Sequence, residues 1–255
     1  MSIILAVANQ KGGVGKTTTC VNLAAALSEA GQRVLVVDLD PQGNATMGAG
    51  VDKHDVRLTM CDLLLGDATP DQVVQQRHGL HVLPANADLT AAEVALMAMA
   101  HRQRRLADVL QGVIRRYEYI VVDCPPSLNM LTLNALVAAH GVVVPVQCEY
   151  YALEGLSALM QTIRQVQQTA NQALKVVGLL RTMFDPRNNL ANEVSAQLIL
   201  HFGDVVFRTI VPRNIRLAEA PSHGLPAIHY DRASRGSVAY RNLAGEIMRR
   251  QAQAA

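Results

Sequence analysis

The stretch KGGVGKTT, residues 11–18, lies between an apolar run, Ile3 to Ala8, and a helix-like segment, Thr17 to Ala30. A strand, a glycine-rich turn and a helix in this order form the setting that a phosphate-binding loop requires. Glycines let backbone N–H groups curl around a phosphate, and the positive end of the helix dipole then faces the anion. The stretch therefore predicts a nucleotide-phosphate site on an α/β fold.

The loop departs from the usual frame G-x-x-x-x-G-K-[ST], because Lys11 stands where the first glycine normally falls. Lys16 is placed to add a point charge on the terminal phosphates, and the Thr17 hydroxyl to ligate Mg²⁺. Lys11 either crowds the same phosphate or points away, and in the second case it could reach a nucleotide held by another subunit. The predicted nucleotide-binding residues of the loop are Lys11, Gly12, Gly13, Val14, Gly15, Lys16, Thr17 and Thr18.

Length and composition favour one intracellular domain. The chain has 255 residues, half of them hydrophobic, which is enough to bury the core of a single α/β domain spanning residues 1–255. Its longest apolar runs are too short for a membrane span, and its start lacks the basic region and cleavage site of a signal peptide. Four widely spaced cysteines fit reduced thiols. We therefore expect a cytoplasmic protein.

Charge is distributed unevenly along the chain. The formal net charge is only +2, yet residues 181–255 carry ten arginines against six acidic residues. The whole chain has four lysines, two of them in the phosphate loop. The planar guanidinium group suits phosphate contacts, so this arginine-rich third is a candidate nucleic-acid surface. An ordinary solvated face explains the same pattern equally well.

Alternating apolar runs and helix-like segments predict a doubly wound, mostly parallel sheet with helices on both faces. The expected strands are Ile3–Ala8, Val34–Asp38, His81–Leu83, Tyr119–Asp123, Val142–Val146, Val176–Arg181 and Phe207–Val211. The expected helices are Thr17–Ala30, Thr90–Arg116, Leu131–Ala139, Leu153–Asn171 and Ala191–His201, with a terminal helix over Glu246–Ala255. In such a fold the site lies at the carboxyl ends of the strands.

Two strand ends carry acidic residues. VLVVDLDPQ, residues 34–42, places Asp40 at the start of a Pro/Gly/Asn segment that could move with the phosphate state. YIVVD, residues 119–123, has the Walker B form, in which Asp123 holds Mg²⁺ through water. We predict Thr17, Asp40 and Asp123 as the magnesium site. Neither segment shows an obvious water-activating glutamate or glutamine, so we expect slow intrinsic hydrolysis unless a partner or a dimer completes the site.

Two further segments, residues 181–189 and 211–222, combine a strand end with a polar loop that contains arginine. Loops at the same edge of the sheet as the phosphate loop could hold the base of a nucleotide and present arginines outward.

Together these residues resemble the ParA/Soj family, the deviant Walker A ATPases that partition chromosomes and plasmids. Five motifs carry the resemblance in order over nearly the whole chain: KGGVGKTT (11–18), VVDLDPQGNAT (36–46), VVDCPPS (121–127), PVQCEYYALEG (145–155) and IVPRNIRLAEAPSHG (210–224). Each motif alone is moderately specific, whereas five in order are very specific. The resemblance implies the P-loop NTPase fold of the deviant Walker A type.

The resemblance also implies roles for individual residues. Lys11 matches the signature lysine that crosses the interface of an ATP sandwich dimer. Lys16, Asp40 and Asp123 match the phosphate lysine and the acids of switch I and switch II, so Lys11, Lys16, Asp40 and Asp123 are the predicted catalytic residues. The segment Pro212, Arg213 and Asn214 matches the segment of the family that contacts adenine. Arg187 and Arg216 match arginines that bind DNA without sequence preference.

The implied protein is an ATPase with ATP or ADP and Mg²⁺ as ligands. Its ATP-bound homodimer binds nucleoid DNA, and a ParB-type centromere-binding protein stimulates hydrolysis and release. The chain resembles the short chromosomal type, so we expect a protein without the N-terminal helix-turn-helix domain of the long plasmid type. Leu225 stands where a lysine is common after the SHG stretch. The terminal segment has too few apolar residues for a membrane-binding helix. Three alternatives stay open: a ParA-like ATPase that positions a protein cargo, a membrane-surface ATPase like MinD, and a non-catalytic binding module that holds nucleotide only as a structural ligand.

Overall fold

Eight strands form one sheet in the order β3-β4-β2-β5-β1-β6-β7-β8 in the computed structural model, which describes residues 2–254. Every neighbouring pair is parallel except β3 and β4, which are antiparallel. The strands are β1 (Ile3–Val7), β2 (Val34–Asp38), β3 (Gln75–Arg77), β4 (Leu80–Leu83), β5 (Tyr119–Asp123), β6 (Gly141–Gln147), β7 (Lys175–Phe184) and β8 (Val206–Pro212).

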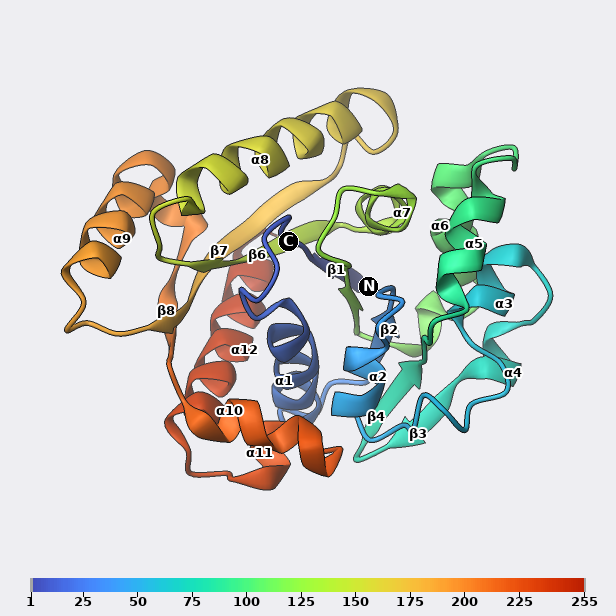
Figure 1. Ribbon diagram of the computed structural model, residues 1–255, viewed down its shortest axis with the longest axis horizontal. Helices are drawn as coiled ribbons and strands as arrows, with labels where there is room; N and C mark the ends of the chain where they lie inside the picture. Colours follow the sequence, from blue (N-terminus) through green and yellow to red (C-terminus); the bar gives the residue numbers. More distant parts are fainter. Residues whose placement is uncertain (1, 255) are drawn as a thin grey trace.

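Helices cover both faces of this sheet (Figure 1). The α-helices are α1 (Lys16–Glu29), α2 (Asn44–Gly48), α3 (Met60–Leu65), α4 (Pro70–Val73), α5 (Leu89–Leu96), α6 (Arg105–Gln111), α7 (Met130–Ala138), α8 (Ala152–Thr169), α9 (Asn189–Phe202), α10 (Ile215–Glu219), α11 (Ala227–Tyr230) and α12 (Arg235–Ala254). Short 3₁₀ turns are η1 (Arg102–Arg104), η2 (Ile114–Arg116), η3 (Gly203–Val205) and η4 (Ala220–His223).

The core has two layers, one on each face of the sheet. One layer packs α3 and α5 to α9 against the sheet, and the other packs α1, α2 and α10 to α12 against the opposite face. The central strands β2 and β5 are buried at every position, which is why their sequences are continuous apolar runs ending in an acid. This architecture confirms the predicted doubly wound, mostly parallel α/β fold.

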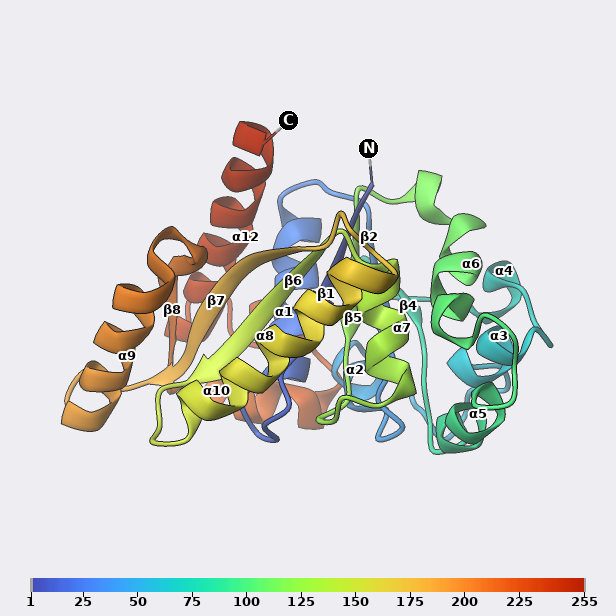
Figure 2. The same cartoon turned by 90° about the horizontal axis from the view of Figure 1, so that it is seen from above.

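The register of the central strands brings three of their carboxyl ends to the same edge of the sheet. Val7 of β1 and Asp38 of β2 both lie beside Asp123 of β5, so three strands end at the same level. Figure 2 shows these carboxyl ends at its lower edge, with α10 nearby, whereas the start of β1 and the end of α12 lie at the upper edge. No helix within residues 2–254 is both long and apolar enough to cross a bilayer.

The predicted helix over Thr90–Arg116 is wrong, because the chain there forms α5, η1, α6 and η2. His101 adopts a left-handed backbone conformation, with φ of 53°, which interrupts the predicted helix. Asn134 of α7 stabilises the break, since its side chain accepts from Leu106 N and donates to Arg102 O. A tertiary contact thus supplies the cap that the local sequence lacks.

The terminal helix begins eleven residues earlier than the predicted Glu246, at Arg235. Ser234 precedes it, and its Oγ accepts from Ser237 N at 3.2 Å, as an N-cap side chain does. Tyr240, Leu243 and Ile247 are buried and share one face of the helix. This amphipathic pattern in residues 235–247 was available in the sequence but was overlooked.

Candidate functional site

The phosphate loop connects β1 to α1 through a backbone that only glycine adopts readily. Gly13 and Gly15 have φ of 74° and 88°, in the left-handed region. Gly15 is the N-cap of α1 and supplies no side-chain hydrogen bond to the first turn of the helix. A Cβ added at Gly12 or Gly13 would meet nothing within 4 Å. The first turn of α1 therefore presents N–H groups and its positive dipole end to an open space that suits an anion.

Lys16 and Thr17 connect this loop to the rest of the site. Lys16 Nζ donates to Lys11 O at 3.0 Å, so its side chain folds back over the loop. Burial lowers the pKa of Lys16, and the negative charges of Asp123 and Asp40 partly oppose that shift. Thr17 Oγ1 donates to Asp123 Oδ2 at 2.7 Å. The hydroxyl and the carboxylate that were predicted to share a magnesium ion are thus in contact.

Three carboxylates gather at the ends of β2 and β5. Asp123 is fully buried, and its Oδ1 has no hydrogen-bond partner among the described residues. Burial and the neighbouring charge of Asp38 raise its pKa well above the usual range. Asp38 is also fully buried, and burial raises its pKa to about 6. Carboxylates buried this deeply favour the neutral form unless a cation lies beside them.

Asp38 was not among the predicted site residues, and its contacts give it a structural task. Its Oδ2 accepts from Thr46 N at 2.8 Å and from Thr46 Oγ1 at 2.7 Å, while Oδ1 accepts from Asp40 N at 3.1 Å. Asp40 in turn accepts from Gln42 N at 3.0 Å. Asp38 therefore fixes both ends of the predicted switch segment, and Asp40 shapes its turn.

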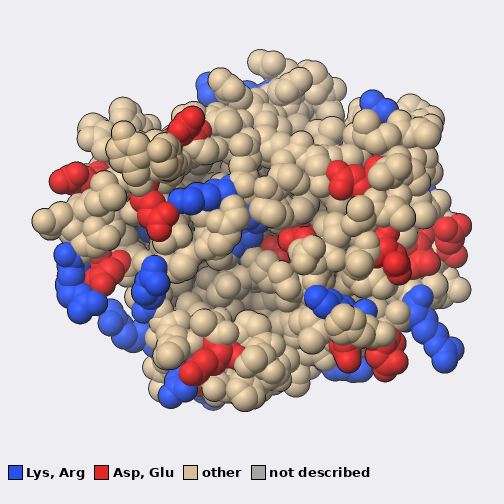
Figure 3. Space-filling view, viewed as in Figure 1, with Lys and Arg blue, Asp and Glu red and all other residues tan. Residues whose placement is uncertain are grey.

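A cavity of about 690 Å³ brings most predicted site residues together. The phosphate loop, Asp40 and the segment Pro212–Asn214 line it, although these parts are far apart in the sequence. On the face drawn in Figure 3 the corresponding hollow lies near the centre. Gln42 also lines this cavity, so the segment after β2 does offer an amide side chain, contrary to the sequence interpretation.

Thr182 and Met183, from the segment 181–189 that was expected near the base, also line the cavity, and so does Tyr240 of α12, which was not predicted. Thr182 Oγ1 donates to Val14 O at 2.8 Å and so supports the phosphate loop from β7. Met183 has φ of 49°, a strained conformation for a residue other than glycine. No local pattern marks Tyr240, because it reaches the cavity through the packing of α12.

Lys11 points away from the phosphate cradle. Its Nζ lies 2.6 Å from Glu149 Oε2, on the segment between β6 and α8, and both side chains are partly exposed. Gln147 also donates to Glu149. Of the two orientations considered for Lys11 from the sequence, the structure shows the outward one.

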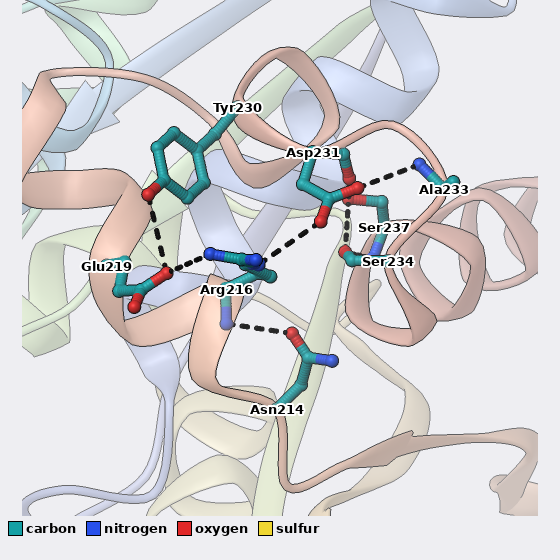
Figure 4. Close-up of polar contacts among 8 residues, drawn as sticks. All are labelled: Asn214, Arg216, Glu219, Tyr230, Asp231, Ala233, Ser234 and Ser237. Atoms are coloured by element: carbon teal, nitrogen blue, oxygen red, sulfur yellow. Dashed lines mark hydrogen bonds and ion pairs between the residues drawn. The ribbon is translucent and has the colours of Figure 1, made fainter.

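The two arginines predicted to bind DNA lie outside the cavity, and both are paired within the chain. Arg187 contacts Asp185 at 2.7 Å and is highly exposed. Figure 4 shows Arg216 between two carboxylates, Glu219 at 2.8 Å and Asp231 at 3.2 Å. The assignment of these arginines to DNA stays a prediction.

The fold and cavity define a P-loop nucleotide-binding class, with a glycine loop, a phosphate lysine and a buried Walker B acid at one sheet edge. The AAA domain family model matches residues 2–176. The sporulation initiation inhibitor protein Soj of Bacillus subtilis is 51% identical over 249 residues, covering 97% of this chain and 98% of Soj. Chromosome partitioning protein ParA of Caulobacter vibrioides is 48% identical, with coverage of 97% and 94%.

Among solved structures, cobyrinic acid a,c-diamide synthase from Mycobacterium smegmatis with bound ADP and magnesium superposes with a TM-score of 0.88. It is 38% identical, and the match covers 100% of this chain and 97% of that one. The chain belongs to the ParA/Soj family of chromosome-partitioning ATPases.

Proposed function

We propose that this chain is an ATP-dependent DNA-partitioning ATPase that works as a single domain in the cytoplasm, on nucleoid DNA. ATP and ADP with Mg²⁺ are its ligands, and its intrinsic hydrolysis is slow. The glycine loop, the helix end and Lys16 bind the phosphates, while Pro212, Arg213 and Asn214 contact the adenine. Membership of the ParA/Soj family and the single cavity that these residues line support the assignment.

The residues around Asp123 fit a magnesium ion. A buried carboxylate oxygen without a partner, next to a threonine hydroxyl and two more acids, is a cation site by its donor chemistry. Thr17, Asp123 and Asp40 would hold Mg²⁺ directly or through water. Bound there, the ion neutralises phosphate charge during phosphoryl transfer. Asp40, a buried residue that lines the cavity, would orient the attacking water.

The outward orientation of Lys11 is the observation that carries the rest of the proposal. A lysine that leaves its own cradle at the edge of the site can contact the terminal phosphate held by a second copy of the chain. ATP would then stabilise a homodimer, and loss of the terminal phosphoryl group would weaken it. The nucleotide biases an equilibrium between one copy and two.

Dimerisation doubles the positive surface that faces DNA, including Arg187 and Arg216. Each of these arginines must exchange a carboxylate of its own chain for a DNA phosphate, which favours weak contacts without sequence preference. A ParB-type centromere-binding partner that stimulates hydrolysis would release the dimer from DNA.

The test is DNA binding with ATP, with ADP and without nucleotide, each at two salt concentrations. We expect tight, salt-sensitive binding only with ATP. Lys16→Ala should abolish ATP uptake and reduce DNA affinity to that of the unchanged protein without nucleotide. Equal DNA affinity in all three nucleotide states would contradict the proposed function.

Asp40→Ala should keep ATP binding but stop hydrolysis, because the variant cannot orient the attacking water. We expect a long-lived ATP dimer that stays on DNA, measured by light scattering after gel filtration and by ATP turnover. A variant that remains monomeric with ATP would contradict the role given to Asp40.

A further inference from the structure

A second hollow lies between β8 and α12, away from the nucleotide cavity. It has a volume of about 870 Å³, and four arginines line it: Arg208, Arg241, Arg249 and Arg250. We call it the arginine groove. None of its lining residues lines the nucleotide cavity. Figure 2 shows α12 running from the site edge to the opposite side of the molecule, where its last turns lie.

The arginines of the groove differ in how far their charges are neutralised. Arg241 pairs with Glu29, and Arg250 pairs with Glu246. Within residues 2–254, neither Arg208 nor Arg249 takes part in an ion pair, and both are exposed. This is the reverse of Arg187 and Arg216, whose charges are neutralised inside the chain.

The acidic residues that line the groove neutralise little of its positive charge. Glu246 is buried, and its carboxylate accepts from Arg208 N, Thr209 N, Thr209 Oγ1 and Arg250. The oxygens of this carboxylate already accept hydrogen bonds from β8 and Arg250, so they are not available to the Arg208 and Arg249 side chains. Among the residues that line the groove, the second acid is Asp204, which is exposed.

A buried cation adds to the positive potential. Arg181 of β7 is 7% exposed and lines an adjoining cavity of about 180 Å³ together with Arg208 and Arg250. Its guanidinium donates only to neutral oxygens, those of Ser195, Phe207 and Arg208, and its Nε has no partner among the described residues. A cation in a low-dielectric setting that is not hydrogen-bonded to a carboxylate is felt over a longer distance than a solvated one.

Gly245 of α12 lines the groove, and a Cβ at that position would come 3.3 Å from an Arg249 guanidinium nitrogen. The Arg249 side chain therefore lies over a helix position that has no side chain. Several guanidinium groups that line one hollow of this size match a row of phosphates better than they match a single small anion.

We propose that the arginine groove binds the phosphate backbone of double-stranded DNA, as a second contact surface besides that of Arg187 and Arg216. The inference rests on the proposed DNA-partitioning function. Because the groove lies away from the phosphate loop, it stays accessible when two copies meet through that edge. Each dimer then carries two such grooves, and both add to the salt dependence of binding.

The test compares Arg208→Ala/Arg249→Ala with a matched control, Arg57→Ala/Arg77→Ala. The control removes the same charge from two exposed arginines that lie outside the groove. DNA affinity is measured with ATP over a range of salt. The groove variant should lose about tenfold or more in affinity, and its log–log salt slope should fall by about two to four, since each lost phosphate contact removes about 0.9. ATP affinity, dimerisation and Tm should match the control.

Equal DNA affinity and slope in the two double variants would overturn the groove assignment, as would an acidic protein segment that occupies the groove without affecting DNA. Failure of the unchanged protein to bind DNA with ATP would overturn the proposed function itself, so the two failures are distinguishable. Arg249→Glu alone, on the solvent side of α12, gives an independent measurement in which a larger loss of affinity is expected.

Discussion

Lys11 of the phosphate loop and Glu149, between β6 and α8, form a partly exposed ion pair. If Lys11 has to reach a second copy of the chain, this pair must open first. Ion pairs of such exposure contribute only about 0.2–1 kcal/mol. Opening the pair therefore makes dimerisation only slightly less favourable.

Glu149→Gln should release Lys11 and lower the ATP concentration needed for half-maximal dimerisation by up to about fivefold, in line with about 1 kcal/mol. Analytical ultracentrifugation across an ATP titration measures the effect. Glu154→Gln removes the same charge from an exposed position on α8 and serves as the control. Weaker dimerisation of Glu149→Gln than of the control would mean that Glu149 itself contributes to the interface.

Gly12 and Gly15 allow backbone strain to be separated from ligand binding. Gly15→Ala puts a Cβ on a left-handed residue with φ of 88°, which costs about 1–2 kcal/mol and should lower Tm. Gly12→Ala adds a methyl group to open space, so Tm should hold, while ATP affinity falls because the methyl group lies where a phosphate must approach. Thermal unfolding and nucleotide titration measure the two effects. Unchanged ATP affinity in Gly12→Ala would argue against the cradle.

At the scale of elements, apolar runs ending in acids predicted the parallel strands well, because a strand buried on both faces leaves a continuous local signal. The break between α5 and α6 gave no such signal, since Asn134 caps it from another helix. The site divides in the same way. Motif residues such as Lys16, Asp40 and Asp123 were predictable, whereas Tyr240 reaches the cavity only through the packing of α12.

Strand β8 is an edge strand, and α12 protects it. Glu246 accepts from two backbone N–H groups of β8, which would otherwise face solvent or another chain. Glu246→Ala should lower the free energy of unfolding by about 1–3 kcal/mol, because it leaves these donors unpaired. Urea unfolding measures the loss. A change within experimental error would show that water replaces the carboxylate at no cost.

The same contact predicts a pH dependence. Burial raises the pKa of Glu246, but hydrogen bonds from Thr209 and Arg208 outweigh it and hold the pKa below its usual value. The unfolded state therefore binds the proton more readily, and the stabilisation is present above the unfolded pKa, near 4.3, and lost as pH falls through the folded value. Glu246→Gln should destabilise the protein less at pH 3.5 than at pH 7. An equal effect at both pH values would contradict this linkage.

At the scale of the whole molecule, the sheet separates two surfaces with different tasks. The carboxyl ends of its strands hold the nucleotide cavity, while the arginine groove is lined by α12. Figure 2 shows α12 running from that edge of the sheet toward the opposite side of the molecule. A nucleotide in the cavity can therefore control how many arginine grooves contact DNA, by controlling dimerisation, without changing the structure of either groove. Affinity then depends on the number of linked surfaces, as in any bivalent ligand.

This arrangement makes the salt dependence of DNA binding a measure of dimerisation. Because the log–log slope counts the phosphates neutralised, an ATP dimer should show about twice the slope of a monomer. We expect the Asp40→Ala dimer with ATP to give the steeper slope and the Lys16→Ala monomer to give the shallower one, each measured by fluorescence anisotropy from low to physiological salt. Equal slopes, with dimerisation of the Asp40→Ala variant verified in the same buffer, would mean that only one copy of each dimer touches DNA.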